Sequence, residues 1–503
     1  PRRAWGDVQD GSNLKQVRFQ VGQFTGGFYY SAEMSLAMRG LEIHGEYARS
    51  SEYFRYYAKV GREKSFDSAP RFSATGDAYF VNLVRWFGWG RLGAELFKIH
   101  PDFESLVEDN DDGDSRPDRG DIDGVYLGLD EDRDGYPDTN RNGDELPDYI
   151  EPFLMYDVEP SEFAYGLDRN NNDEPDFRED DSEPDYPYDW DQRGYHLFAQ
   201  LDLSRHWSLA VGRYQATEML GFGRSKTFYS LLTYRREDAG RRRKLFFENN
   251  LRRVKDDIPD RYNVIEEARR FSSVYRAFSV NTVTNIRTIG LRGFQPKNRK
   301  DPLSYRDSYV NESYLEARMQ PLRALNLVQK LRLRLNWQQS SVLPSGFRAR
   351  ERRLDYWTSV HTVDYTWRRG RLTVQPKFKF LALRSVDQSS AQLIRSEYDT
   401  LPILQASYQL MRRSVFRIGV QGWGPLPYHF DDRARKLESF ERRTAFSSVT
   451  MSSGYFGYQL ITIVGLERDQ LRYDEPARKS ENFNTVSFFV RALIGFTEYG
   501  RLL

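Results

Sequence analysis

Cysteine is absent from this chain of 503 residues, which excludes disulfide frameworks, thiolate metal sites and cysteine nucleophiles. Histidine is scarce, and its six copies are scattered without the spacing of a zinc-protease motif. The sequence also has no GxSxG serine motif and no glycine-rich loop followed by the Lys-Ser/Thr of a phosphate site. We therefore expect no catalytic function, and we interpret the histidines as structural residues.

Long apolar runs are absent as well. No window approaches the roughly 18 consecutive apolar residues that a membrane-spanning helix needs. A membrane-spanning strand is not excluded, because its outward apolar residues alternate with polar ones and average away. Mean hydropathy is −0.73, yet 15% of the residues are aromatic, which disfavours disorder.

Charge is distributed unevenly along the chain. Residues 102–191 hold 33 acidic residues against 6 arginines and no lysine, a net charge of −27. The remainder holds 40 acidic and 68 basic residues, a net charge of +28. This segregation indicates parts with different surroundings or partners. We divide the sequence into residues 1–101, an acidic insert over 102–194, and residues 195–503.

One spacing recurs in the acidic insert: three Asp or Asn at alternate positions, followed by Pro-Asp. Side chains at alternate positions of a tight loop converge on one point, as the oxygen ligands of Ca²⁺ require. Without Cys or His in the pattern, zinc and copper are disfavoured. The predicted Ca²⁺ ligands are Asn110, Asp112, Asp114 and Asp118; Asp130, Asp132, Asp134 and Asp138; Asn140, Asn142, Asp144 and Asp148; and Asp168, Asn170, Asn172 and Asp176.

The copy at 130–138 resembles the calcium loops of the thrombospondin type-3 and dockerin-like family, whose unit is Asp-x-Asp-x-Asp-Gly-x-x-Asp. Gly135 follows the third ligand as in that unit, whereas the copies that begin at Asn110 and Asp168 lack this glycine. The resemblance implies a chain of bound Ca²⁺ ions that organises a segment with little apolar core. The alternative is a solvated acidic linker, which would not repeat the Pro-Asp phase four times.

Outside the insert, apolar and polar residues alternate with the period of two that is typical of β-strands. Leu331, Leu333 and Leu335 alternate with Arg332 and Arg334. Near the end of the sequence, residues 486–496 keep one apolar face for eleven residues, the length of a tilted strand that crosses a bilayer.

Aromatic residues gather near the ends of the expected strands, as in the interfacial girdles of membrane barrels. Ordinary sheet aromatics are the alternative. The girdle candidates are Trp86, Trp89, Tyr356, Trp357, Tyr365, Trp367 and Tyr499. With the strand pattern, they give the chain a general resemblance to outer-membrane porin-like barrels.

Link lengths also favour a barrel, because eight very short links alternate with longer polar ones. The eight hairpins give 16 strands, and one further strand at each end of the sequence gives about 18, within a range of 16 to 20. The first of these end strands is expected at residues 17–21. Residues 256–308 are ambiguous, since Phe271–Leu291 could add a pair. The predicted fold is all-β: a transmembrane, antiparallel, up-and-down barrel with the acidic insert between strands five and six.

Basic residues occupy the polar face of the predicted strands, which would face the lumen. An electropositive lumen would favour anions. The alternative is that these residues pair with lumen carboxylates such as Glu33, Glu42 and Glu46. The lumen candidates are Arg18, Arg39, Lys330, Arg332, Arg334, Lys377, Lys379, Arg417 and Arg491.

These patterns predict a channel or transporter in the outer membrane of a Gram-negative bacterium, which passes or gates anionic solutes. The calcium-binding insert would face the extracellular side as a cap or plug. A second hypothesis is a surface adhesin or assembly component, in which the barrel is an anchor and the insert binds a partner protein. An outer-membrane hydrolase is a third. Nucleic acid is not an expected partner, because the basic residues are spread over many strands.

Overall fold

The fold is described from a computed structural model, which describes residues 24–55, 71–103, 153, 156, 165–171, 191–238, 242–259, 261–267, 294–300, 303–342, 348–390, 392–455 and 458–496. Most of these residues belong to β-strands. Within them, no helix is long and apolar enough to span a bilayer.

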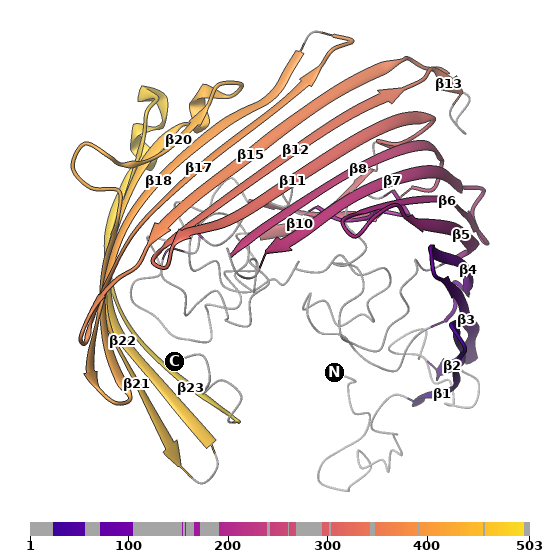
Figure 1. Cartoon of the computed structure of the whole chain (residues 1–503), viewed down its shortest axis with the longest axis horizontal. Helices are drawn as coiled ribbons and strands as arrows, with labels where there is room; N and C mark the ends of the chain where they lie inside the picture. The colour runs from indigo at the N-terminus through magenta and orange to yellow at the C-terminus, as the bar shows by residue number, and fades with distance from the viewer. Residues whose placement is uncertain are drawn as a thin grey trace, which may run out of the picture.

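One antiparallel sheet of nineteen strands forms the protein wall, and neighbouring strands pair in up-and-down order (Figure 1). Its strands are β1 Phe24–Met38, β2 Leu41–Arg55, β3 Arg71–Phe87, β4 Gly90–Ile99, β5 Gln192–Asp202, β6 Trp207–Glu218, β7 Arg224–Asp238, β8 Arg243–Asp256, β11 Ser308–Leu322, β12 Leu325–Gln338, β15 Arg352–Tyr365, β16 Trp367–Arg369, β17 Leu372–Asp387, β18 Gln392–Met411, β19 Ser414–Gln421, β20 Tyr428–Asp432, β21 Phe440–Tyr455, β22 Tyr458–Tyr473 and β23 Phe483–Phe496. This confirms the predicted all-β, antiparallel, porin-like fold.

Two of the nineteen strands continue a neighbour across a break. β15 and β16 pair with the same edge of β17, and β19 and β20 both lie between β18 and β21. The wall therefore has seventeen full positions, close to the predicted 18. The predicted strand over 17–21 lies outside the described residues.

The ambiguous region after β8 contains an extra strand pair, but not in the wall. β9 Arg261–Glu267 and β10 Phe294–Lys300 pair with each other in a separate two-stranded sheet, and β8 pairs directly with β11. Residues 271–291 lie outside the described ranges. Another small ribbon, β13 Ser341–Val342 with β14 Arg348–Ala349, and two 3₁₀ turns, η4 Lys436–Glu438 and η5 Pro476–Glu481, lie in longer links.

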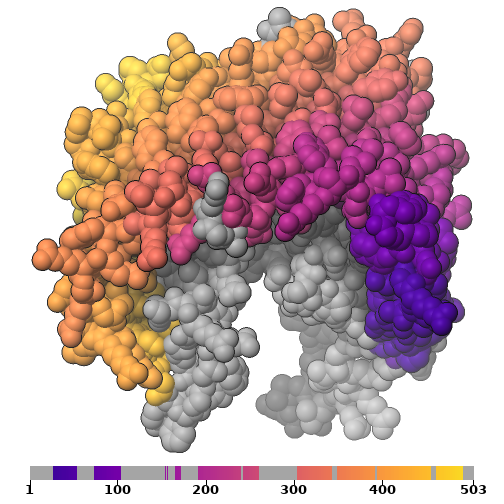
Figure 2. Space-filling view, viewed as in Figure 1, coloured from indigo at the N-terminus to yellow at the C-terminus, as the bar shows by residue number. Residues whose placement is uncertain are grey.

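The short links after β1, β3, β5, β11, β16 and β18 form tight hairpins at one rim, as predicted, and those after β7 and β21 include residues outside the described ranges. Between β1 and β2, Arg39 and Gly40 have φ angles of 47° and 78°, the two positive values of a hairpin turn that matches the twist of the strands. The sheet curves into an arch, with β1 and β23 on opposite sides of it (Figure 2). No pairing joins these two strands among the described residues.

The two faces of the sheet differ in chemistry. Directly paired residues in antiparallel strands share a face, so the register assigns every wall position to one of two faces. One face exposes Met34, Leu96, Leu251, Leu331 and Phe488. Such an apolar face fits the hydrocarbon of a bilayer. We call it the outer face and the opposite one the inner face.

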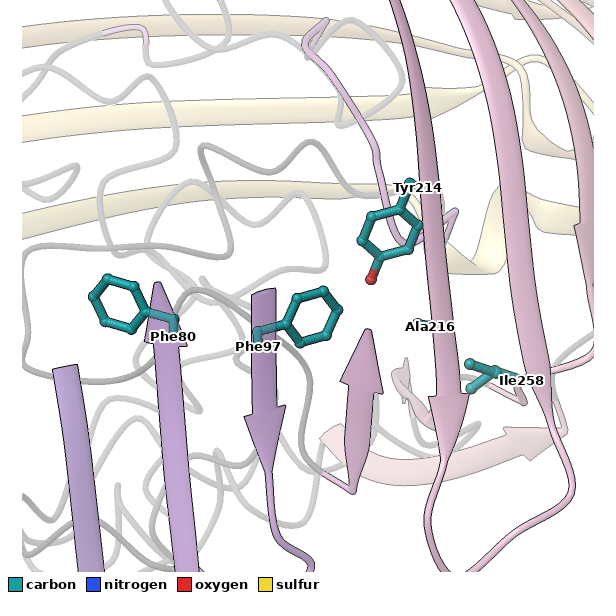
Figure 3. Close-up of a cluster of buried hydrophobic side chains, with 5 residues drawn as sticks. All are labelled: Phe80, Phe97, Tyr214, Ala216 and Ile258. Atoms are coloured by element: carbon teal, nitrogen blue, oxygen red, sulfur yellow. The ribbon is translucent and has the colours of Figure 1, made fainter. Parts of the chain in front are cut away.

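The inner face holds the small packed clusters of the molecule. Phe80, Phe97 and Tyr214 line up on β3, β4 and β6 with Ala216, and Ile258 closes the group from beyond β8 (Figure 3). The rings of Phe97 and Tyr214 stack at 5.9 Å. The inner face thus has local apolar packing, whereas the exposed apolar band lies on the outer face.

Several expected girdle aromatics are on the outer face or in its turns, and two are not. Trp89, Trp357, Tyr365 and Trp367 are exposed. Tyr356 is buried on the inner face beside Arg334, because it is directly paired with that residue. Trp86 likewise has the inner-face phase, opposite Arg91, whose guanidinium lies 5.1 Å from its ring. Tyr499 lies outside the described residues.

Candidate functional site: the inner face and the acidic insert

The acidic insert joins β4 to β5, and its described residues contact the wall. Around β8, the Tyr165 hydroxyl donates a hydrogen bond to Glu248 at 2.9 Å, and the Tyr165 ring stacks on Tyr314 of β11 at 4.4 Å. The Asn171 amide donates to the hydroxyls of Ser225 and Thr227 on β7, at 3.2 and 3.0 Å. Residues 165–171 thus contact three neighbouring strands of the sheet, β7, β8 and β11, through hydrogen bonds and a ring stack.

A second part of the insert contacts a different region of the wall. Tyr156 packs with Leu401 and Ile403 of β18 and Tyr428 of β20. Phe153 packs edge-on against Phe446 of β21 at 5.0 Å. A Cβ on Gly419 of β19 would lie 2.7 Å from the Phe153 ring, so that glycine is what lets the ring approach.

All these wall contacts are on the inner face. Glu248 is directly paired with Tyr314, Tyr314 with Arg332, and Arg332 with Thr358. The pairing continues across β17 and β18 to Gly419 of β19 and on to β21, so the wall residues that the insert contacts in both regions lie on the same face of the sheet. From Tyr156 to Tyr165 the chain can span about 30 Å when extended. About five strand spacings of 4.8 Å separate β11 from β19, so the insert has the length to cross the interior.

A buried charge network surrounds Arg252 of β8, which is 3% exposed. Its guanidinium donates to the Asp168 carbonyl at 2.8 Å and lies 3.4 Å from the Asp168 carboxylate. Glu312 of β11 is 3.6 Å from Arg252 and only 2.6 Å from Arg332 of β12. The insert thus supplies one carboxylate to a cluster of wall arginines.

The insert residues on either side of Asp168 add a neutral hydroxyl and a positive charge to this cluster. Burial, together with the adjacent Glu248 carboxylate, raises the pKa of the Tyr165 hydroxyl above its usual value, so Tyr165 stays a neutral donor. Arg169 of the insert lies 3.8 Å from Glu95 of β4. Two charged residues of the insert therefore face wall residues of opposite charge: Asp168 faces Arg252, and Arg169 faces Glu95.

The predicted lumen residues fall into three groups. Lys330, Arg332, Arg334, Lys377, Lys379 and Arg417 share the inner-face phase of the sheet, and their role in a lumen stays a prediction. Arg39 does not: it lies in the β1–β2 turn, exposed, where its carbonyl accepts a hydrogen bond from Arg85. Arg18 and the side chain of Arg491 lie outside the described residues.

Both alternatives for the charge of the inner face are seen. Arg332 pairs with Glu312, and buried Arg442 with Asp469 at 3.0 Å. By contrast, no carboxylate in the described part of the chain forms an ion pair with Arg417, and the Lys377 ammonium lies 4.7 Å from the Tyr156 ring. The predicted pairing carboxylates Glu33, Glu42 and Glu46 are far along the sheet, in β1 and β2.

Of the sixteen predicted calcium ligands, only Asp168 and Asn170 are among the described residues. Asp168 contacts Arg252, as above, and no group of three His, Asp or Glu in the described ranges is arranged to hold a metal ion. The ligands at 110–148, together with Asn172 and Asp176, lie outside those ranges, so calcium binding stays a prediction.

A second polar chain on the inner face was not predicted. His196 of β5, 1% exposed, is hydrogen-bonded to Glu95 at 2.9 Å and to the Tyr229 hydroxyl of β7 at 2.8 Å. The sequence does signal that Glu95 and His196 share the polar phase of adjacent strands. It gives no signal that Arg169 joins Glu95, because that contact depends on how the insert folds back.

Comparisons with known proteins add one finding. No protein-family model matches the sequence, and no curated protein does. Solved structures of outer-membrane porins are similar to it. Pseudomonas aeruginosa OpdK with vanillate has 8% sequence identity over 94% of this chain and 93% of that chain, with a TM-score of 0.29. A BenF-like porin from Pseudomonas fluorescens Pf-5 has 8% identity over 94% of this chain and 92% of that chain, with a TM-score of 0.29, and Acinetobacter baumannii OccAB2 has 7% identity over 94% of this chain and 92% of that chain, with a TM-score of 0.27. With TM-scores this low, the fold rests on the strand pairing itself.

Proposed function

We propose that this protein is an outer-membrane channel for anionic solutes, in which the acidic insert acts as a plug. The observation that carries the proposal is the attachment of the insert to two separate regions of the inner face. An exposed apolar outer face supports the membrane placement. The long-link rim would face the extracellular side, as in barrels with short periplasmic turns.

The attachments suit a plug that is released and rebound. Around β8, the insert is held by hydrogen bonds and ion pairs, together with the stacking of Tyr165 on Tyr314. Such contacts exchange readily for contacts with water or with a competing solute. An anionic solute would compete with Asp168 for Arg252 on β8, and would then meet Arg332 and Arg334 on β12, two strands away across β11.

We further propose that the loops at 110–148 hold Ca²⁺. The donor set, alternate carboxylates and amides, fits a hard cation. Bound cations would offset the repulsion among the 33 acidic residues of 102–191 and give the insert a defined shape. The copy at 168 is the least suited, because its first carboxylate is already bound by Arg252.

Planar-bilayer recording tests the channel directly. The purified chain should conduct anions better than cations, and deletion of residues 104–190 should raise its conductance. A chain that inserts but conducts neither before nor after the deletion would be an anchor. That result would favour the surface adhesin, with the insert as its partner-binding part.

A further inference from the structure

Basic side chains gather on the outer face where β4, β5, β7 and β8 approach the long-link rim. Lys98 follows the exposed Leu96 by two positions, and Lys226 precedes the exposed Phe228 by two. Arg193 on β5 and Lys255 on β8 lie within two residues of each other along the register, with Arg193 nearer the long-link rim. We call Lys98, Arg193, Lys226 and Lys255 the basic rim patch.

The register of this patch opposes like charges. Lys98 is directly paired with Arg193, and Lys226 with Lys255. Like charges at directly opposite positions destabilise an antiparallel sheet. Two carboxylates relieve part of this repulsion: Asp77 lies 2.8 Å from Lys98, and Asp307 lies 4.0 Å from Lys255.

The other two cations have no such relief. Arg193 and Lys226 are exposed, and no carboxylate in the part of the chain that the structure describes forms an ion pair with either. Arg213 on β6, the strand between β5 and β7, is also exposed, and it donates a hydrogen bond to the neutral Gln215. The patch therefore keeps an unbalanced positive charge on the face that carries the apolar band.

We propose that the basic rim patch binds a lipid whose headgroup carries phosphate. The acyl chains would lie along the exposed Leu96, Leu197, Phe228 and Leu251, and the phosphate would lie among the four cations directly above them. An apolar surface continuous with a cationic edge matches a lipid better than a soluble anion, which uses only the charges. This inference rests on the proposed membrane placement.

The experiment compares two forms of one lipid. The full chain in neutral detergent is titrated with fluorescent lipid A, which carries two phosphates, and with the same lipid after enzymatic dephosphorylation. Since each basic residue near an anionic lipid surface contributes about a fivefold gain in affinity, the wild-type chain should prefer the phosphorylated form by at least about tenfold. Added salt should weaken this preference.

Matched variants locate the site. Lys226→Gln with Lys255→Gln should abolish the preference, whereas Arg236→Gln with Arg243→Gln, exposed on the same two strands at the opposite rim, should leave it within about twofold. Lys226→Arg with Lys255→Arg should retain it. Equal lipid preference in wild type and in the Gln pair would overturn the proposal.

Stability separates binding from a structural role. In neutral detergent without lipid, the Lys226→Gln, Lys255→Gln variant should unfold at the same or a higher temperature than wild type, because it loses a like-charge pair. If it unfolds earlier, Arg193→Gln alone is tested, and an unchanged preference there also overturns the proposal. A wild-type chain that is soluble without detergent would instead refute the membrane placement itself.

Discussion

The contact between Arg252 and Asp168 gives the sharpest test of the plug. Replacing Arg252 by Met removes a buried guanidinium that binds the insert through both the carbonyl and the carboxylate of Asp168. Glu312 keeps its ion pair with Arg332 at 2.6 Å, so the substitution leaves no unpaired carboxylate in the wall at Glu312. The perturbation therefore falls mainly on the attachment of the insert.

The magnitude follows from the burial of the pair. Breaking a buried ion pair by removing one partner costs about 3–5 kcal/mol, because the other charge is left without compensation. Here Asp168 can leave with the insert and regain water, so the loss appears as undocking and not as unfolding. We expect the ratio of docked to undocked insert to fall by about a hundredfold, which is the lower end of that range at 1.4 kcal/mol per tenfold.

The absence of cysteine makes the assay simple. A single thiol introduced as Gly166→Cys, beside the docked Tyr165, would be the only reactive cysteine in the chain. Its labelling by a maleimide should accelerate by about two orders of magnitude in the Arg252→Met background. Arg442→Met is the control: it breaks a similarly buried pair, with Asp469, that involves no described insert residue.

Unchanged labelling in Arg252→Met would refute the role of this pair in holding the insert. Equal acceleration in Arg442→Met would show that the whole wall had loosened. The double variant Asp168→Asn with Arg252→Met should label no faster than Arg252→Met alone, because both changes remove the same interaction.

Three further predictions use other parts of the chain. The purified protein in detergent should show β-type circular dichroism and heat-modifiable migration in electrophoresis, since paired strands resist unfolding; a monomer that is soluble without detergent would contradict the fold's placement in a membrane. Chelation of Ca²⁺ should expose residues 102–191 to protease, and Asp132→Ala with Asp134→Ala should mimic the chelator while sparing the wall; equal protection with and without chelator would argue against calcium. Gly419→Ala places a Cβ 2.6 Å from Phe446 and 2.7 Å from Phe153, so cleavage near 153 should increase while the unfolding temperature of the wall changes little; cleavage at the wild-type rate would show that Phe153 is not held there.

The alternation of apolar and polar residues was enough to predict the strands of the wall and the two faces of each strand. Leu331 and Leu333 point outward while Arg332 and Arg334 point inward, because successive side chains of a strand face opposite sides whatever their partners are. The hairpin turns were predictable for the same reason: each depends on a few local residues, such as Arg39-Gly40. Tyr356 and Trp86 lie on the inner face because the phase of a strand, and not the residue type, decides which side a side chain faces.

The position of the insert could not be read from the sequence. Its charge and its calcium-type spacing are local properties, and they were visible along the chain. The contacts of Tyr156 with β18 and of Asp168 with Arg252 join residues that are far apart in sequence, and they exist only because the sheet curves to bring β8 and β18 within reach of one loop. Sequence determined the strands, their faces and the charges; the curvature of the sheet decided which charges meet.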